Sequence, residues 1–137
     1  EVIYQSKYLK IINDSKSTTL SSTVPFLESN EKIIWILGGL FKKGDKFNLN
    51  KKYFKNLEAY IYGKDRQVFF KLFKNKIKVN LSKDLRNTLK LIPNLKDIRT
   101  KVTVLFSPSA ASFDQYKNFE ERGRQFNMLI KRYLPIE

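Results

Sequence analysis

Two almost uninterrupted apolar runs, IIWIL at 33–37 and VTVLF at 102–106, limit most strongly what this chain can fold into. A strand with one face in water alternates apolar and polar residues, and these runs hardly alternate. They are typical of strands that helices cover on both faces of a parallel sheet. Shorter apolar runs, which end at Asn13, Gly63 and Asn80, predict further strands.

Helical patterns occupy four stretches between and after these runs: 20–27, 65–75, 82–92 and 116–133. We expect Pro25 to kink or divide the first helix, and Ser82 and Asp114 are candidate N-caps of the last two. In the last stretch the apolar side chains share one face, and Gly123 would allow a close approach to the sheet. The alternation predicts an α/β fold, a three-layer domain with a mostly parallel sheet of about five to six strands and helices on both faces.

Length and residue content bound the kind of protein. The 137 residues suit a single domain, which we place at 1–137. The chain has no cysteine and no histidine, which excludes disulfides, thiolate metal sites and imidazole catalysis, and we expect no metal site. No apolar run approaches the roughly 20 residues of a membrane span, so we expect a cytoplasmic protein without membrane contact. We further expect it to be a monomer. The start at Glu1 suits an excised fragment or a processed protein.

The net charge of +14 raises the question of a nucleic-acid partner. In the stretch 41–55, lysines interleave with four aromatic residues, as in proteins that bind single-stranded nucleic acid: Phe41, Phe47, Tyr53 and Phe54. The other interpretation, which we favour, is that the aromatic side chains fill a core while the lysines stay in water. Lysine is abundant along the whole chain, and arginine, which reads bases best, is scarce. A nucleic-acid-binding module that uses 41–55 remains the alternative function.

A polar cluster follows each of three predicted strands: NDSKSTT at 13–19, GGLFKKGDK at 38–46 and SPSAASFD at 107–114. Ligands of open α/β sheets bind beyond the carboxyl ends of the strands, so we expect the clusters to meet at one edge. Their hydroxyls, lysines and small residues predict a site for a small anionic substrate, although caps and turns use the same residue types. The phosphate-binding pattern GxxxxGK(S/T) is absent, so this chain does not cradle a triphosphate by itself.

Taken together, the three clusters resemble the carboxy-terminal domain of the D-glutamate-adding Mur ligase family. NDSKSTT resembles that family's NDSKATN, and WILGGLFKKGD resembles its strand-GG-x-x-K loop. SPSAASFDQYKNFEERG resembles its long SPACASFDQFKNFEERG signature, and the resemblance covers nearly the whole chain in order. The family's motifs differ from this chain at several positions, among them cysteine at Ala110, alanine at Ser17 and asparagine at Thr19.

The resemblance implies a Rossmann-like domain of a larger three-domain ligase. Such a ligase uses ATP to form the amide bond between UDP-N-acetylmuramoyl-L-alanine and D-glutamate in peptidoglycan biosynthesis. It further implies that ATP and Mg²⁺ are bound mainly by a central domain absent from this chain, and that this chain alone is inactive. A domain that has lost the activity and serves only protein contacts would instead have a disordered rim at the strand ends.

The resemblance also assigns roles to individual residues. Five residues would surround D-glutamate: Thr18, Lys42, Ser112, Phe113 and Phe119. Two would face the nucleotide across a domain interface: Asp14 and Lys16. No side chain would act as a nucleophile, and catalysis would come from positioning by Lys16, Lys42 and Ser112.

Overall fold

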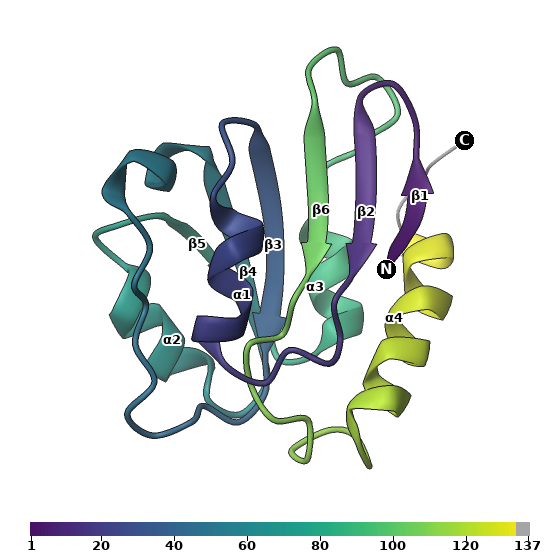
Figure 1. The fold of residues 1–137 in the computed structure, drawn as a ribbon. Helices are drawn as coiled ribbons and strands as arrows, with labels where there is room; N and C mark the ends of the chain where they lie inside the picture. Colours follow the sequence, from purple (N-terminus) through teal and green to yellow (C-terminus); the bar gives the residue numbers. More distant parts are fainter. Residues whose placement is uncertain (134–137) are drawn as a thin grey trace.

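The protein is described here by a computed structural model that covers residues 1–133 (Figure 1). Its single sheet has six strands in the order β1-β2-β6-β3-β4-β5. The strands are β1 Val2–Gln5, β2 Leu9–Asn13, β3 Lys32–Gly38, β4 Leu57–Tyr62, β5 Lys78–Leu81 and β6 Val102–Phe106. All neighbours pair in parallel except β1, which pairs antiparallel with β2. The predicted, mostly parallel sheet is confirmed, and β1 is the strand that the sequence patterns missed.

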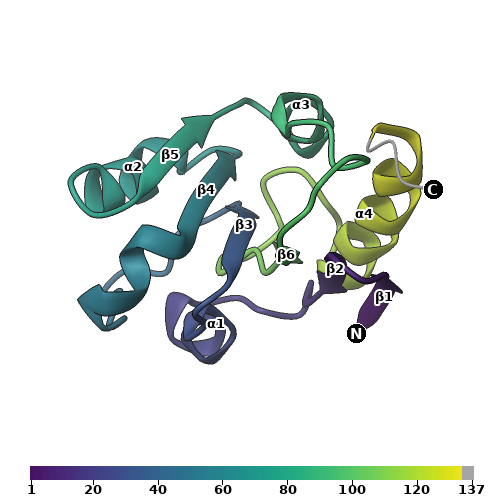
Figure 2. The same cartoon turned by 90° about the horizontal axis from the view of Figure 1, so that it is seen from above.

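Helices cover both faces of the sheet (Figure 2). They are α1 Leu20–Leu27, α2 Arg66–Phe73, α3 Leu85–Leu91 and α4 Phe119–Tyr133, with a short 3-10 helix at Lys51–Asn56. Side chains of α3 and α4 join one buried apolar cluster, and side chains of α1 and α2 join a second one across the sheet. The three-layer α/β architecture is therefore confirmed. Within residues 1–133, no helix combines the length and the apolarity that crossing a bilayer requires.

Strand β3 shows why its sequence is apolar throughout. Ile34 and Ile36 belong to the cluster beneath α3 and α4, whereas Ile33, Trp35 and Leu37 belong to the cluster beneath α1 and α2. Successive side chains of a strand point to opposite faces, so a strand buried on both faces has no position left for a polar residue. The sequence expectation for this run is confirmed.

Two expectations about the shorter helices are wrong in detail. Asp84, not Ser82, caps α3, because its carboxylate accepts a hydrogen bond from the backbone N–H of Asn87 at 2.8 Å. Pro25 does not divide α1, which continues through it to Leu27, and the expected kink stays a prediction. Proline lacks a single backbone N–H, so it removes at most one hydrogen bond from the helix.

The start of α4 also differs from the expectation. The helix begins at Phe119, and the side-chain oxygen of Asn118 accepts a hydrogen bond from the backbone N–H of Glu121 at 2.8 Å. Asp114 is therefore not its cap. Its carboxylate instead accepts the backbone N–H of Lys64 at 3.0 Å, which ties the segment before α4 to the end of β4.

Candidate functional site

The strand order brings the three polar clusters together. They follow β2, β6 and β3, which are adjacent in the sheet, and all leave it at the carboxyl end, the lower edge in Figure 1. The backbone N–H of Asp14 donates to the carbonyl of Phe106 at 2.7 Å, and that of Gly38 donates to the carbonyl of Pro108 at 3.0 Å. The three clusters therefore meet at one edge of the sheet, as the sequence predicted.

Buried hydroxyls join two of these clusters. The Thr23 hydroxyl, on α1, lies 2.7 Å from those of Ser107 and Ser109 and 2.8 Å from that of Ser17. The Ser107 hydroxyl donates to the carboxylate of Asp14 at 2.7 Å. All five residues are buried, and Asp14 is only 8% exposed. The network fixes the loop after β2 against the loop after β6 and leaves little of Asp14 accessible from outside.

The loop after β3 is fastened to the loop after β6. Leu40 and Ala111 form an isolated antiparallel bridge, with N–H to carbonyl distances of 2.9 and 3.0 Å. Gly39 permits this approach: it has φ +128, and a Cβ built on it would collide with the carbonyl oxygen of Ala111. Ala111 directly precedes Ser112, so the bridge holds the lysine-bearing loop beside the predicted serine.

A long-range contact fastens the same loop to the start of α1. The Asp45 carboxylate accepts the backbone N–H of Leu20 at 2.5 Å and the hydroxyl of Ser21 at 3.1 Å. An acidic side chain at a helix N-terminus is favourable because it satisfies free N–H groups and interacts with the helix dipole. Lys42 thus lies on a loop whose two ends contact the segments that carry Thr18 and Ser112.

The seven residues assigned by resemblance occupy these loops and the first turn of α4. Asp14 and Ser112 are buried, whereas Lys16, Thr18, Lys42 and Phe113 are exposed. Phe113 has 71% of its surface exposed and Phe119 has 39%, so neither belongs to the apolar core. Phe119 and Lys16 line one open hollow of about 410 Å³ beside the start of α4.

Sequence reasoning missed Arg122, a fully buried cation on α4. Its guanidinium donates to the carbonyl of Ala110 at 2.7 Å, to that of Ser15 at 2.8 Å and to that of Ser17 at 3.2 Å. The one available signal was its place in the FEERG motif, beside a glycine on the buried face of the helix. Gly123 leaves room there for the Ser15 side chain, which a Cβ at this position would displace.

The carboxylate of Asp114 acts on the positive charge of Arg122 through space, without forming an ion pair with it. Among the described residues Arg122 forms no ion pair, and its Nε is buried without a hydrogen-bond partner. Burial lowers the pKa of this guanidinium by removing it from water, yet arginine remains charged in proteins. Burial also raises the pKa of Tyr116 to about 12 and that of Tyr62 further, so neighbouring phenols stay neutral near pH 7.

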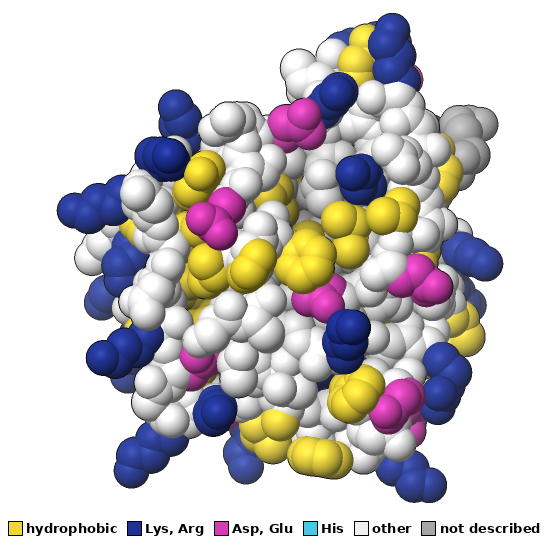
Figure 3. Space-filling view, viewed as in Figure 1, with side chains coloured by type: hydrophobic (Ala, Val, Ile, Leu, Met, Phe, Trp, Pro, Cys, Tyr) yellow, Lys and Arg dark blue, Asp and Glu magenta, His cyan; other side chains and the backbone are white. Residues whose placement is uncertain are grey.

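The aromatic residues of 41–55 are occupied by the core. Phe47 stacks on Trp35 at 5.8 Å and on Phe54 at 6.0 Å between ring centroids, and it meets Phe73 edge-on at 4.8 Å. The lysines of this stretch are exposed, and Lys and Arg side chains surround the face drawn in Figure 3 without forming one block. A nucleic-acid site needs accessible stacking platforms, so this arrangement disfavours the alternative function.

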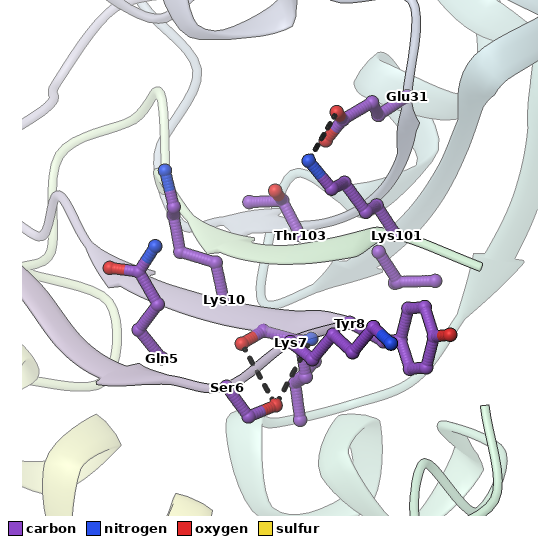
Figure 4. A pocket seen from close by; sticks show the side chains of 10 residues that line it. Gln5, Ser6, Lys7, Tyr8, Lys10, Glu31, Lys101 and Thr103 are labelled. Atoms are coloured by element: carbon purple, nitrogen blue, oxygen red, sulfur yellow. Dashed lines mark hydrogen bonds and ion pairs between the residues drawn. The ribbon is translucent and has the colours of Figure 1, made fainter. Parts of the chain in front are cut away.

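A separate hollow lies at the opposite end of the sheet (Figure 4). It has a volume of about 180 Å³ and is formed where β2 and β6 begin, with Lys7, Lys10 and Lys101 around it. Glu31 pairs with Lys101 there at 3.9 Å. None of the residues assigned by resemblance lines this hollow. Within residues 1–133, no group of acidic side chains is arranged to hold a metal ion.

Comparison with known proteins tests the resemblance. No family model matches the chain. The chain is 35% identical over 127 residues to a UDP-N-acetylmuramoylalanine–D-glutamate ligase of Wolbachia pipientis. This match covers 92% of this chain and 25% of that protein. The chain is also 40% identical over 136 residues to the ligase of the same name of Buchnera aphidicola subsp. Schizaphis graminum, and this match covers 96% of this chain and 30% of that protein. The chain is homologous to one part of the D-glutamate-adding Mur ligases.

The predicted resemblance to these Mur ligases is thereby confirmed, although it covers only part of their length. The chain spans about a quarter to a third of the length of these two relatives, 25% and 30%. The crystal structure of a UDP-N-acetylmuramate–alanine ligase from Thermotoga maritima matches 96% of this chain and 29% of its own, with a TM-score of 0.61. At 14% identity, that match shows a shared fold.

Proposed function

We propose that residues 1–137 form a single domain, the carboxy-terminal, D-glutamate-binding domain of a cytoplasmic, monomeric ligase. That ligase would join D-glutamate to UDP-N-acetylmuramoyl-L-alanine with ATP in peptidoglycan biosynthesis. The observation that carries the proposal is the meeting of three loops at one sheet edge in a homologue of D-glutamate ligases. These loops carry the residues that the resemblance assigns to the amino acid.

The chemistry of the three loops suits a dicarboxylic amino acid. Glutamate offers two carboxylates, which bind most strongly to charged donors and to hydroxyls. Lys42 supplies an exposed ammonium group, and Thr18 and Ser112 supply hydroxyls from the neighbouring loops. Phe113 and Phe119 expose apolar surface at the same edge, where they would cover the methylene groups of the ligand and exclude water.

The chain does not fit a complete site for ATP and Mg²⁺. It has no phosphate-binding loop, and its described residues form no acidic cluster for a metal. We therefore place nucleotide and metal on a domain outside this chain, where ATP would activate the carboxylate of the UDP-sugar substrate. The exposed Lys16 would face that nucleotide, and Asp14 would hold the loop that carries it. The role of this chain is to hold the glutamate amine against the activated carboxylate.

Lys42→Ala tests the assignment in a polypeptide that carries this domain and the nucleotide-binding domain. Loss of a charged hydrogen bond to substrate should raise the apparent KM for D-glutamate about tenfold or more. Lys43→Ala, at the exposed neighbouring position, is the matched control and should leave KM unchanged. An unchanged KM in Lys42→Ala would mean that Lys42 does not bind D-glutamate. The chain alone, mixed with ATP, Mg²⁺ and both substrates, should show no turnover.

A further inference from the structure

We infer that Arg122 is a positioning residue, which holds the loops after β2 and β6 in register and places a buried positive charge beneath the proposed D-glutamate site. The inference rests on the proposed function for its ligand. The hydrogen bonds that motivate it are independent of that function.

The hydrogen bonds of Arg122 connect two loops through one rigid group. Its Nη1 donates to Ala110, in the loop after β6, and its Nη2 donates to Ser15 and Ser17, in the loop after β2. The guanidinium is planar, so these carbonyls are fixed relative to each other as well as to α4. Ser15 and Ser17 flank Lys16, and Ala110 lies two residues before Ser112.

The loops are clamped from both faces of the sheet. Thr23 joins them from the α1 side through hydroxyls, and Arg122 joins them from the α4 side through backbone carbonyls. The two residues that join the loops differ in charge. Thr23 is neutral, whereas Arg122 is a cation without an ion-pair partner in the described part of the chain. A buried charge is poorly screened by water, so it attracts an anion held at the adjacent loops.

Two substitutions separate the two contributions of Arg122: the hydrogen bonds that join the loops, and the positive charge. Arg122→Lys keeps a positive charge but loses the planar fork, whereas Arg122→Met loses both and keeps a long apolar stem. Arg132→Met is the matched control, because Arg132 is an exposed arginine in the last turn of the same helix. In the 137-residue chain, D-glutamate affinity is measured by NMR titration, and hydrogen exchange is measured at the amides of 13–19 and 107–112.

We expect Arg122→Met to weaken D-glutamate binding about tenfold or more and Arg122→Lys to weaken it less, while Arg132→Met binds as the wild type does. Amide exchange should rise at 13–19 and 107–112 in both Arg122 variants, with exchange in β4 and β5 unchanged. Stronger D-glutamate binding by Arg122→Lys than by Arg122→Met would show that the charge contributes to binding beyond a purely structural role. If Arg122→Met does not fold, Arg122→Lys carries the test.

The two proposals fail in different ways. Wild-type affinity and wild-type exchange in Arg122→Lys would overturn the inference, even if D-glutamate binds. Equal loss of binding in the lysine and methionine variants would overturn the contribution of the charge. If neither the wild type nor any variant binds D-glutamate, but amide exchange rises in the two loops of the Arg122 variants, the proposed function fails. The inference that Arg122 holds the two loops together then still stands.

Discussion

The hydroxyl of Thr23 lies 2.7 Å from the hydroxyl of Ser107, a residue 84 positions later in the chain. Thr23 belongs to α1, and Ser107 is the first residue beyond β6. This contact is the centre of the buried network that also includes Asp14, Ser17 and Ser109. A helix early in the chain is thereby fixed to the loop that leads to Ser112.

Thr23→Val should lower the free energy of unfolding by about 1–3 kcal/mol. Valine has nearly the shape of threonine, so packing changes little. The free energy is lost because the buried hydroxyls of Ser17, Ser107 and Ser109 no longer have the Thr23 hydroxyl as a hydrogen-bond partner. Urea unfolding measures the change. The control is Thr100→Val, at an exposed position, which should stay within about 0.5 kcal/mol of the wild type. A loss equally small in Thr23→Val would show that the network adds nothing to stability.

Alanine substitution at two glycines separates backbone strain from a steric clash. Gly39 and Gly44 both have positive φ, but only at Gly39 would the new Cβ collide with another segment, at Ala111. Gly44→Ala should cost about 1–2 kcal/mol through strain alone, and Gly39→Ala should cost more. Equal losses in thermal unfolding would contradict the close approach of the two loops.

Two phenylalanines of α4 should separate binding from stability. Phe126 is buried and stacks on Phe106 at 4.3 Å between ring centroids, so Phe126→Ala should cost about 3–5 kcal/mol. Phe119 is 39% exposed, and Phe119→Ala should cost far less stability while weakening D-glutamate binding. Urea unfolding and an NMR titration of both variants measure the two effects. Undiminished binding in a folded Phe119→Ala would remove Phe119 from the proposed site.

The stability of the protein should depend on Glu58 in weak acid. Burial alone would raise the pKa of this carboxyl, but the hydrogen bond from Tyr60 at 2.6 Å and the charges of Lys78 and Lys32 outweigh burial and lower it. A lowered pKa in the folded state contributes stability that is complete above the unfolded value, near pH 4.5. That stability is lost as the pH falls through the lower, folded value.

Glu58→Gln should therefore be less stable than the wild type at neutral pH, and the difference should shrink as the pH falls below about 4. Urea unfolding across a pH series measures it. Glu31→Gln is the control, because Glu31 has an exposed ion pair of 3.9 Å that should contribute little at any pH. A constant difference for Glu58→Gln across this range would show that the carboxyl is not held in its charged form.

The predictions that succeeded from sequence rest on local patterns. The runs 33–37 and 102–106 identify buried strands because burial on both faces excludes polar residues. The polar clusters were correctly predicted to meet at one edge because the carboxyl ends of parallel strands share one side of the sheet. Strand β1 was missed because four residues at an antiparallel edge carry little pattern.

What the sequence could not provide depends on contacts between distant segments. Arg122 is charged, and charged residues are rarely buried, so its burial follows only from the carbonyls that the folded loops present to it. Asp45 is a loop residue by sequence, and its role at the start of α1 exists only once β3 and α1 are in place. The assignment of Thr18, Lys42 and Ser112 to D-glutamate stays a prediction.

Because β6 occupies the slot between β2 and β3, the centre of the sheet stays open until residues 102–106 arrive. An emerging polypeptide can pair β3 with β4 and β4 with β5 on its own, but β2 and β3 have no direct pairing to bring them together. Inserting β6 between β2 and β3 requires contacts between residues far apart in the sequence. Such contacts form slowly because long loops must close first. The loop after β6 can join the other two at the lower edge only once residues 102–106 are in place, so a ribosome must release most of this domain before the three loops can meet.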